Sequence, residues 1–306
     1  MRRVLITGVS GFVGSALARG LSAAGAEVCG TYIGAPPIGL DGEAVEADLS
    51  DDSRLARLVE SYDPSVVVHL AGLSHVGESW KRIADYFKVN FLGSENVFRA
   101  AAGRHILFAS SAEVYGSVPP EEQPIAEEHP LAPATPYALT KAAAERLAQA
   151  AGAIVVRCFN LIGRGQDPSF ALPSFAQQLA QIKLGHGPPR LEVGNLDARR
   201  DFLHIDDAVR GYALLIERGQ PGASYNLGSG TALSIRDALD GLMRVAGVDA
   251  EVVVDPGRYR PAEVESLSAD TSRLAALGWR AEKNLEQALA DIWSEAIERQ
   301  EAAGLG

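Results

Sequence analysis

The sequence has little cysteine, no long hydrophobic run and a shortage of positive charge. Its two cysteines, Cys29 and Cys158, lie in apolar stretches typical of strands, which favours a reduced cytoplasmic protein over a disulfide scaffold. The 28 Lys and Arg against 39 Asp and Glu leave a net charge of -11, so neither nucleic acid nor an anionic membrane is expected as the main partner. No apolar run approaches the ~18 residues of a membrane span, and the glycine at position 8 comes too early for a signal peptide. The six histidines show no metal-ligand spacing with the cysteines, so no metal is expected.

The chain begins with a short apolar run that ends in a glycine-rich turn. The run, residues 4–7, reads as a strand, and a helical pattern continues from the turn to Leu21. Strand, glycine turn and helix form the context in which a dinucleotide is bound, because glycines let the backbone approach the pyrophosphate at the positive end of the helix. The spacing is G-x-x-G-x-x-G, and the residues expected to contact the cofactor are Gly8, Gly11, Phe12, Val13 and Gly14.

Further cofactor contacts are expected where the next strands end. The strand of residues 27–31 ends in Thr31-Tyr32-Ile33, which offers neither the acid that binds a ribose 2′-hydroxyl nor an arginine for a 2′-phosphate. The missing acid favours NADP(H) slightly over NAD(H). Asp48 and Leu49 follow a third strand, and they either contact the adenine or simply form a turn and helix cap. A buried strand at 65–69 runs into small residues that suit a backbone lying against a cofactor, namely Leu70, Ala71 and Gly72.

The most informative motif is Tyr137-Ala138-Leu139-Thr140-Lys141. Tyr137 and Lys141 are four residues apart and therefore share one face of a helix. A phenol has a pKa of about 10, and a nearby ammonium favours the phenolate; lowering that pKa by about three units takes roughly 4 kcal/mol. A tyrosine tuned in this way exchanges a proton with a carbonyl or alcohol oxygen while a hydride moves at the carbon. Taken alone, the spacing also fits a chance pair on a surface helix.

Ser111 ends the strand predicted from residue 105, where α/β folds place their chemistry. We expect Ser111 to meet Tyr137 and to bond the same substrate oxygen. The alternative is that Ser110 and Ser111 merely cap a turn.

The whole chain is expected to form a doubly wound parallel α/β sheet with a smaller carboxyl-terminal substrate domain. The dinucleotide domain covers residues 1–160 with 201–222 returning to it, and the substrate domain covers mainly 161–200 and 223–306. One long helix is predicted through Phe98, and Ser234 with Asp237 predicts a capping box at a helix start.

Several of these segments, taken together, resemble one enzyme family. The glycine turn, Asp48-Leu49, His69-Leu70-Ala71-Gly72, residues 111–116 and Tyr137-x-x-x-Lys141 occur in the order found in extended short-chain dehydrogenases/reductases (SDRs) that act on nucleotide-sugars. The resemblance covers nearly the whole chain. It implies that Ser111, Tyr137 and Lys141 form the catalytic triad and that Tyr137 and Lys141 also touch the nicotinamide ribose.

The carboxyl half resembles the GDP-mannose branch of that family, through residues 193–202, Ile182-Lys183-Leu184-Gly185 and Arg260-Pro261-Ala262-Glu263-Val264. Two activities of that branch compete: GDP-mannose 4,6-dehydratase, and the reductase of GDP-4-keto-6-deoxy-D-mannose. The short connection after Tyr32 resembles the reductase. Glu113 matches the second acid-base group of dehydratases, but reductases resemble them there too. Ala112 replaces the polar residue that dehydratases place beside that glutamate, which argues against dehydration.

A sugar diphosphate needs planar donors, and arginine binds phosphate oxygens with two N–H groups at once. Arg200 and Arg260 are the candidates, although each also has an acidic neighbour with which it could form a surface ion pair. The full set of expected substrate contacts is His75, Asn160, Lys183, Arg200, Arg260 and Glu263.

The sequence therefore predicts NAD(P)H-dependent reduction of the C4 keto group of a GDP-linked 4-keto-6-deoxyhexose, giving GDP-D-rhamnose. The alternatives are 4,6-dehydration, 4-epimerisation and, from another class, a non-catalytic dinucleotide sensor. By analogy with relatives, a homodimer is expected through a four-helix bundle formed by the helix after His69 and the helix of Tyr137.

Overall fold

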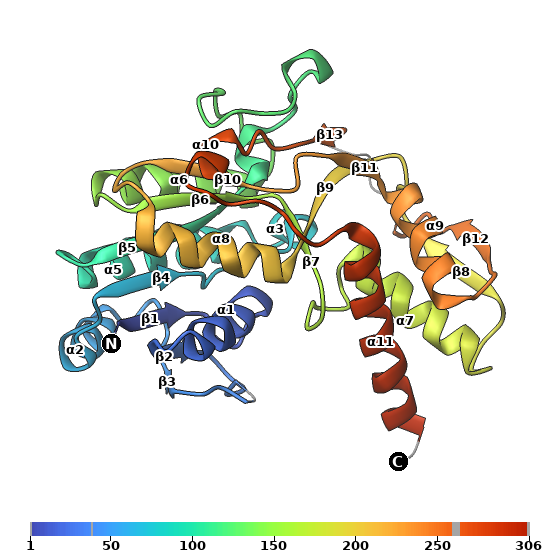
Figure 1. Cartoon of the computed structure of the whole chain (residues 1–306), viewed down its shortest axis with the longest axis horizontal. Coiled ribbons are helices and arrows are strands. Elements are labelled where there is room, and N and C mark those ends of the chain that lie inside the picture. Colours follow the sequence, from blue (N-terminus) through green and yellow to red (C-terminus); the bar gives the residue numbers. More distant parts are fainter. Residues whose placement is uncertain (1, 38, 259–263, 305–306) are drawn as a thin grey trace.

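The computed structural model describes residues 2–37, 39–258 and 264–304, and its centre is a parallel sheet of seven strands (Figure 1). The strands are β1 (Arg3–Thr7), β2 (Glu27–Tyr32), β3 (Glu43–Glu46), β4 (Val66–His69), β5 (His105–Ser111), β6 (Ile154–Cys158) and β10 (Ser224–Leu227). Their spatial order is β10-β6-β5-β4-β1-β2-β3. Chain order reverses at β1, so the carboxyl ends of β1 and β4 border the crevice in which such sheets bind ligands. The predicted doubly wound parallel sheet is confirmed.

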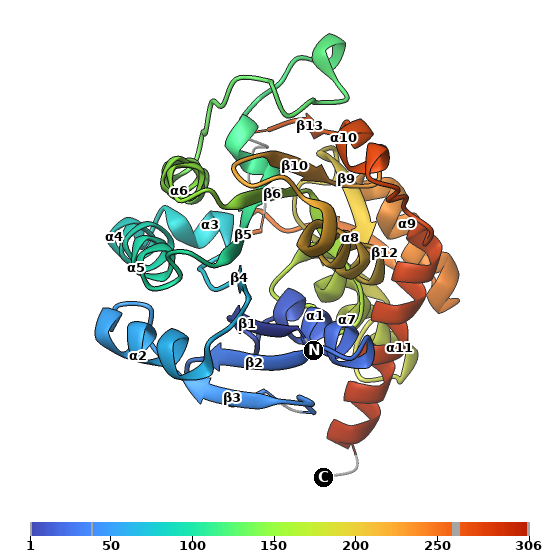
Figure 2. The same cartoon turned by 60° about the vertical axis from the view of Figure 1, so that its left-hand side comes forward.

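Helices cover both faces of this sheet, as Figure 2 shows. One face packs against α1 (Phe12–Ala23) and α8 (Ile205–Arg218), and the other against α2 (Asp52–Tyr62), α5 (Gly93–Ala100) and α6 (Pro136–Ala150). Alternate residues of each strand enter different cores: Val4 and Ile6 face α1, whereas Leu5 faces α2. Burial on both faces explains why these strands are almost continuously apolar.

The predicted long helix through Phe98 is present from Ile83 onward. There α4 (Ile83–Tyr86), the π-helical η1 (Phe87–Leu92) and α5 follow one another without a break. The short α3 (Val76–Ser79) is separate, because the backbone leaves the helical conformation at Arg82, with φ of -131°. Asn90 lies within the π-helical turn, which changes the register of the side chains that follow it.

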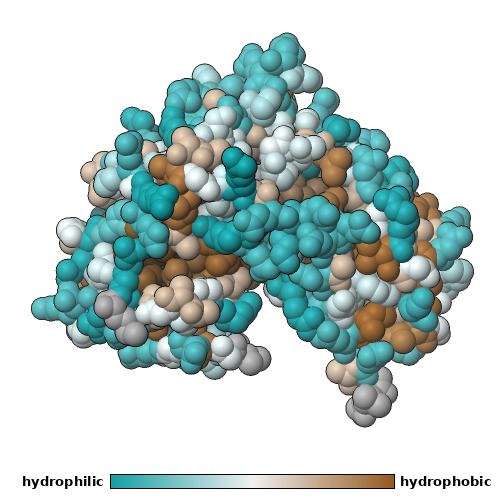
Figure 3. Space-filling model, viewed as in Figure 1, coloured by the Kyte–Doolittle hydropathy of each residue, from teal (hydrophilic) through white to brown (hydrophobic). Residues whose placement is uncertain are grey.

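A second unit packs beside the sheet around a separate apolar core. It contains α7 (Ala171–Lys183), α9 (Ile235–Ala246) and α11 (Leu285–Gly304), together with the parallel strands β8 (Arg190–Val193) and β12 (Glu251–Val254). The predicted capping box is confirmed, since Ser234 and Asp237 bond each other's backbone at the start of α9. Figure 3 shows the surface hollowed between this unit and the sheet unit, on the side toward which α11 projects.

Shorter elements join the two units. A small sheet contains β7 (Asn160–Ile162), β9 (Arg199–His204), β11 (Ala232–Ser234) and β13 (Ser266–Leu267). The remaining pieces are the 3-10 turns η2 (Ala112–Tyr115) and η3 (Pro120–Glu122) and the helix α10 (Ser272–Ala276).

The contacts divide the chain differently from the predicted ranges at two places. Strand β9 belongs to the small sheet, although we expected residues 201–222 to return to the dinucleotide domain, where α8 does pack. Strand β10 is the edge of the seven-stranded sheet, and Leu274 and Trp279 share its core, although 223–306 were assigned mainly to the other domain. Strands of four to six residues, such as β10 and β9, carry too weak a pattern to be assigned to a sheet from sequence.

Candidate functional site

The glycine turn joins β1 to α1 at the crevice. Gly8 has a φ of +74°, and a Cβ there would lie 2.8 Å from the Cα of Ala71. A Cβ on Gly14 would lie 2.2 Å from the carbonyl oxygen of Gly8, so only glycine lets the helix start this close to the turn. Gly11 caps α1 without a side-chain hydrogen bond, and the first helical turn, which includes half-buried Phe12 and Val13, carries no acid. The amino end of α1 is therefore suited to an anion such as a pyrophosphate.

The ends of β2 and β3 flank this turn. The carbonyl oxygen of Thr31 accepts the N–H groups of Gly8 and Val9, both at 2.9 Å, which ties β2 to the turn. Asp48 accepts the N–H of Ser50 at 2.8 Å, and this hydrogen bonding holds the pKa of Asp48 below its ordinary value. Leu49 is buried in the core. The cap of α2 is Asp51, which accepts the N–H of Arg54 at 2.9 Å, and the expected adenine contact of Asp48 and Leu49 stays a prediction.

The segment after β4, Leu70 to Gly72, lies against both the turn and α6. Ala71 N–H donates to Thr7 Oγ1 at 3.2 Å. A Cβ on Gly72 would lie 3.0 Å from Asn90 Oδ1 and 3.6 Å from Lys141 Nζ. The small residues predicted to contact a cofactor therefore lie between the glycine turn and Lys141.

Helix α6 presents Tyr137 and Lys141 on one buried face. Thr135 caps the helix by accepting the N–H of Ala138, and Pro136 occupies the first helical position. Tyr137 is 8% exposed and Lys141 is 6% exposed. Lys141 Nζ donates to the carbonyl oxygen of Ala109 at 2.8 Å and lies 4.9 Å from the centre of the Phe108 ring.

Burial dominates the electrostatics of this pair. It raises the pKa of Tyr137 above its ordinary value, with a hydrogen bond to Ser111 acting in the opposite direction and the charge of Glu113 adding to the rise. Burial also lowers the pKa of Lys141 to about 8. Loss of hydration is the largest cause of the raised pKa, and Lys141 is not among the groups that shift it, so the expected lowering of the Tyr137 pKa by Lys141 stays a prediction.

Ser111 and Glu113 lie at the end of β5, next to Tyr137. The Ser111 hydroxyl accepts the N–H of Glu113 at 3.2 Å and so starts η2. Glu113 also acts on Arg200: burial lowers the pKa of the Arg200 guanidinium, and the charge of Glu113 partly offsets that effect. Arg200 Nη1 donates hydrogen bonds to the carbonyl oxygens of Arg199 and Val264, at 2.9 and 3.0 Å. The structure thus brings together Ser111, Glu113, Tyr137 and Arg200.

Asn90 belongs to the same site and was not identified from the sequence. Its Oδ1 accepts the N–H of Leu73 at 2.8 Å, and its Nδ2 donates to Leu73 O at 2.9 Å and to Thr140 Oγ1 at 3.2 Å. This buried amide pins the loop after Gly72 to α6 beside Lys141. The only signal in the sequence was a polar residue inside an otherwise helical pattern.

His75 lies where the two units meet. Its ring stacks on Phe170, with ring centres 5.3 Å apart, and its carbonyl oxygen accepts the hydroxyl of Tyr86 at 2.6 Å. The Tyr86 ring in turn meets the edge of Tyr137. Asn160 is the exposed first residue of β7, paired in register with Phe202 of the small sheet.

Of the remaining predicted substrate residues, Lys183 does not join this group. Lys183 is the last residue of α7, about 18 Å along the axis from the helix start beside Phe170. Its ammonium donates to the carbonyls of Ala246 and Gly247 at the end of α9. Arg260 and Glu263 lie outside the described residues.

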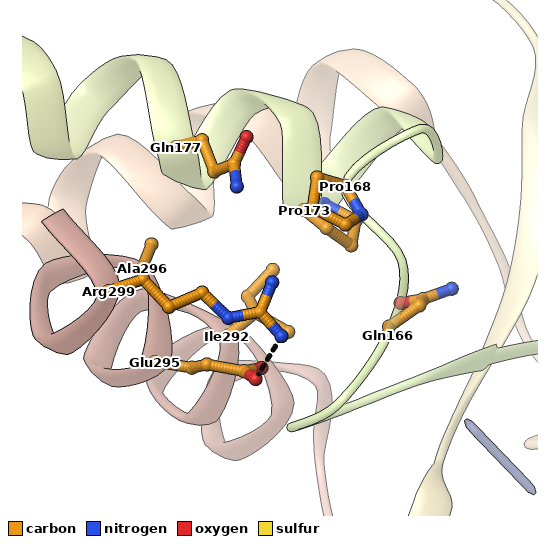
Figure 4. A pocket seen from close by; sticks show the side chains of 8 residues that line it. All are labelled: Gln166, Pro168, Pro173, Gln177, Ile292, Glu295, Ala296 and Arg299. Carbon is orange, nitrogen blue, oxygen red and sulfur yellow. Dashed lines mark hydrogen bonds and ion pairs between the residues drawn. The ribbon is translucent and has the colours of Figure 1, made fainter. Parts of the chain in front are cut away.

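A separate small pocket lies between α7 and α11 (Figure 4). It includes none of the predicted site residues and is lined by Gln166, Pro168, Pro173, Gln177, Ile292, Glu295, Ala296 and Arg299. Within the described ranges, no three His, Cys, Asp or Glu side chains group as metal ligands. None of the helices in the described part of the chain combines the length and hydrophobicity that crossing a membrane requires.

Comparison with known proteins agrees with this geometry. A family model described as GDP-mannose 4,6 dehydratase matches residues 5–292. The chain is 37% identical to GDP-6-deoxy-D-mannose reductase of Pseudomonas aeruginosa, over 96% of this chain and 97% of the relative. The structure of RMD from Pseudomonas aeruginosa complexed with NADPH has a TM-score of 0.87 at 36% identity, covering 98% and 100% of the two chains. MoeE5 in complex with UDP-glucose and NAD has a TM-score of 0.85 at 28% identity, covering 98% and 99%.

The doubly wound sheet, the glycine turn and the Ser111–Tyr137–Lys141 group define the class as extended SDR enzymes that use a nicotinamide dinucleotide. Within that class, the chain belongs to the GDP-mannose 4,6-dehydratase family. The resemblance inferred from the sequence is confirmed.

Proposed function

We propose that this protein reduces the C4 carbonyl of GDP-4-keto-6-deoxy-D-mannose with a hydride from NAD(P)H, forming GDP-D-rhamnose. The observation that carries the proposal is the buried Tyr137, hydrogen-bonded to Ser111 and one helical turn from Lys141 at the open end of the sheet. The 37% identity to a GDP-6-deoxy-D-mannose reductase over nearly the whole chain supports the substrate class.

The roles of the residues follow from their protonation and position. A bound nicotinamide dinucleotide would supply the hydride to the sugar C4, and the turn from Gly8 to Gly14 would hold its pyrophosphate. Because its pKa is raised, Tyr137 carries its proton at neutral pH and is a donor to the C4 oxygen as that oxygen gains charge. Ser111 donates a hydrogen bond to the same oxygen. With a pKa of about 8, Lys141 is largely charged at neutral pH and orients the cofactor ribose.

Arg200, His75 and Asn160 are the described candidates for holding the substrate. Arg200 lies beside Glu113 and offers guanidinium N–H groups suited to a diphosphate. An Arg200→Met variant should raise KM for the nucleotide-sugar more than it lowers kcat, since the guanidinium binds the diphosphate in both the ground and transition states.

A second candidate is 4,6-dehydration, favoured by the family model and by Glu113 beside Tyr137. Dehydration needs a base for the C5 proton and an acid for the leaving C6 hydroxyl. The neighbour of Glu113 is the buried, apolar Ala112, which offers no second polar group there. We therefore place reduction first.

We propose only a small preference for NADP(H). No acid follows β2 directly in the chain, but Glu46 of neighbouring β3 accepts the N–H of Gly34 at 3.3 Å, and residues 32–53 contain no Lys or Arg to bind a 2′-phosphate. A charge-assisted contact to that phosphate would be worth about 1.5–3 kcal/mol, or roughly 12- to 150-fold. Without one, the ratio of kcat/KM values for NADPH and NADH should stay within about tenfold.

The deciding experiment uses two incubations of the pure protein. One contains GDP-mannose with NADP+, and the other contains GDP-4-keto-6-deoxy-mannose with NADPH; absorbance of reduced nicotinamide and product NMR are followed. Loss of NADPH only in the second supports the reductase, and NMR assigns the C4 configuration. A 4-keto product in the first, without net cofactor change, would instead support the dehydratase.

We also propose a cytoplasmic homodimer formed through α3 to α6. Four large apolar side chains in this region are 46–55% exposed: Trp80, Ile83, Leu92 and Leu139. Such a grouped apolar surface is typical of an interface. The Leu92→Asp/Leu139→Asp variant should run as a monomer in light scattering, whereas Val254→Asp, at a comparably exposed apolar residue on β12, should leave the dimer intact.

A further inference from the structure

A buried ion pair lies directly behind the catalytic residues. Glu145 follows Lys141 by one turn of α6 and Tyr137 by two, while Arg157 is on β6. Their side chains are 1% and 5% exposed. Arg157 Nη2 donates to Glu145 Oε2 at 2.9 Å, and Nε donates to the two carboxylate oxygens at 3.1 and 3.2 Å. This fork-shaped contact fixes α6 against the sheet in both distance and direction.

The same pair also holds the segment that carries Ser111 and Glu113. Ser110, the neighbour of Ser111 in β5, donates to the Glu145 carboxylate. Arg157 Nη1 donates to the hydroxyl of Tyr115, the last residue of η2, at 3.0 Å, and to Glu127 O at 2.8 Å. All three guanidinium nitrogens are therefore engaged. The pair links the two segments that supply the catalytic side chains.

Strand register explains how the pair reaches both segments. Ser110, Arg157 and Asn226 are direct neighbours across β5, β6 and β10. Asn226 accepts the Tyr115 hydroxyl at 2.7 Å, which closes the network on the far side. This row lies one residue before Ser111, so the network supports the end of the sheet from immediately below.

Stability alone does not require charges at this position. Buried ion pairs are often replaced by apolar residues of similar volume without loss of stability. Proton transfer, in contrast, requires the phenol to be held within roughly 0.5 Å of its working position. We propose that Arg157 and Glu145 are positioning residues that set Tyr137 and Lys141 against Ser111 and Glu113. The proposal rests on the catalytic roles assigned under the proposed function.

The test compares wild type with a Glu145→Met/Arg157→Met double variant by thermal unfolding, kcat and KM. The double variant is expected to stay folded, with kcat lowered at least about tenfold by misplacement of the phenol and KM for the nucleotide-sugar within about threefold. A folded double variant with wild-type kcat would overturn the proposal.

Leu289→Ala is the matched control. Leu289 is buried in the core formed by α7, α9 and α11, and that core contains no residue of the Arg157–Glu145 network. The substitution should lower the melting temperature and keep kcat. An equal loss of kcat in this control would show that reduced stability alone is responsible, and the proposal would be wrong.

Ser110→Ala removes a single hydrogen bond to Glu145 and decides the question if the double variant does not fold. We expect kcat to fall about three- to tenfold with nearly unchanged KM, and an unchanged kcat would reject the positioning role. If wild type reduces no sugar, the proposed function fails. The affinity for NADPH, measured by its fluorescence, then tests the positioning role. Weaker NADPH binding in the folded variants supports that role, and unchanged NADPH binding counts against it.

Discussion

Replacing Lys141 by methionine should stabilise the folded protein while removing its activity. Burial lowers the pKa of Lys141 from 10.5 to about 8. Each pKa unit corresponds to about 1.4 kcal/mol, so keeping this ammonium charged in the fold costs roughly 3 kcal/mol at neutral pH. Methionine has a similar unbranched stem without the charge. The lost contacts to Ala109 O and the Phe108 ring offset part of the gain, which leaves about 1–2 kcal/mol.

The pH dependence of this effect has a defined sign. Below about pH 8, Lys141 is protonated in both the folded and unfolded states, and the whole destabilising effect is present. Between about pH 8 and 10.5, the unfolded chain binds more protons, so the stability of wild type rises relative to that of the variant. The advantage of Lys141→Met should therefore shrink across that window and reverse above it, because only the loss of the contacts to Ala109 O and the Phe108 ring then remains.

Urea unfolding at neutral pH and at about pH 10 measures this difference in the free energy of unfolding. Lys81→Met, at a lysine whose side chain is 67% exposed, is the control and should show no comparable change between the two pH values. Activity of Lys141→Met at neutral pH should fall about 100-fold or more. A Lys141→Met protein less stable than wild type at neutral pH, or a difference that does not change with pH, would refute the reasoning.

Three further outcomes are expected. Gly14→Ala should weaken NADPH binding about 5- to 150-fold in a fluorescence titration, because the added Cβ would lie 2.2 Å from a backbone oxygen and overpacking typically costs about 1–3 kcal/mol. Gly187→Ala is the control, since a Cβ there would meet nothing within 4 Å. Tyr137→Phe should lower kcat about 10²- to 10⁴-fold and keep the fold by circular dichroism; retained turnover would exclude Tyr137 as the proton donor. Asp201→Ala should cost about 3 kcal/mol in urea unfolding, because buried Asp201 accepts backbone N–H groups of residues 229, 230 and 269; a loss below about 1 kcal/mol would contradict this.

Much of the fold and the centre of the site were predictable because the relevant signals are local. The spacing of Gly8, Gly11 and Gly14 after an apolar run specifies a turn and a helix start, and the structure places them there. The spacing of Tyr137 and Lys141 specifies a shared helix face, and both side chains are buried on it. Each of these patterns spans fewer than ten residues.

Other features depended on contacts between distant segments and were missed. The Tyr115 hydroxyl meets Asn226, which is 111 residues away, and Asn90 meets Thr140 across 50 residues. No pattern within either segment indicates such a partner. The π-helical turn that contains Asn90 was likewise not predicted.

The sequence by itself determined the class of fold and the glycine turn, and it predicted the catalytic residues. The tertiary structure alone decided their electrostatics: it raised the pKa of Tyr137, lowered that of Lys141, and placed the Arg157–Glu145 pair behind both. The physical reason is that a helix or turn follows from neighbouring residues, whereas the hydration and field at a buried group are set by every segment packed around it.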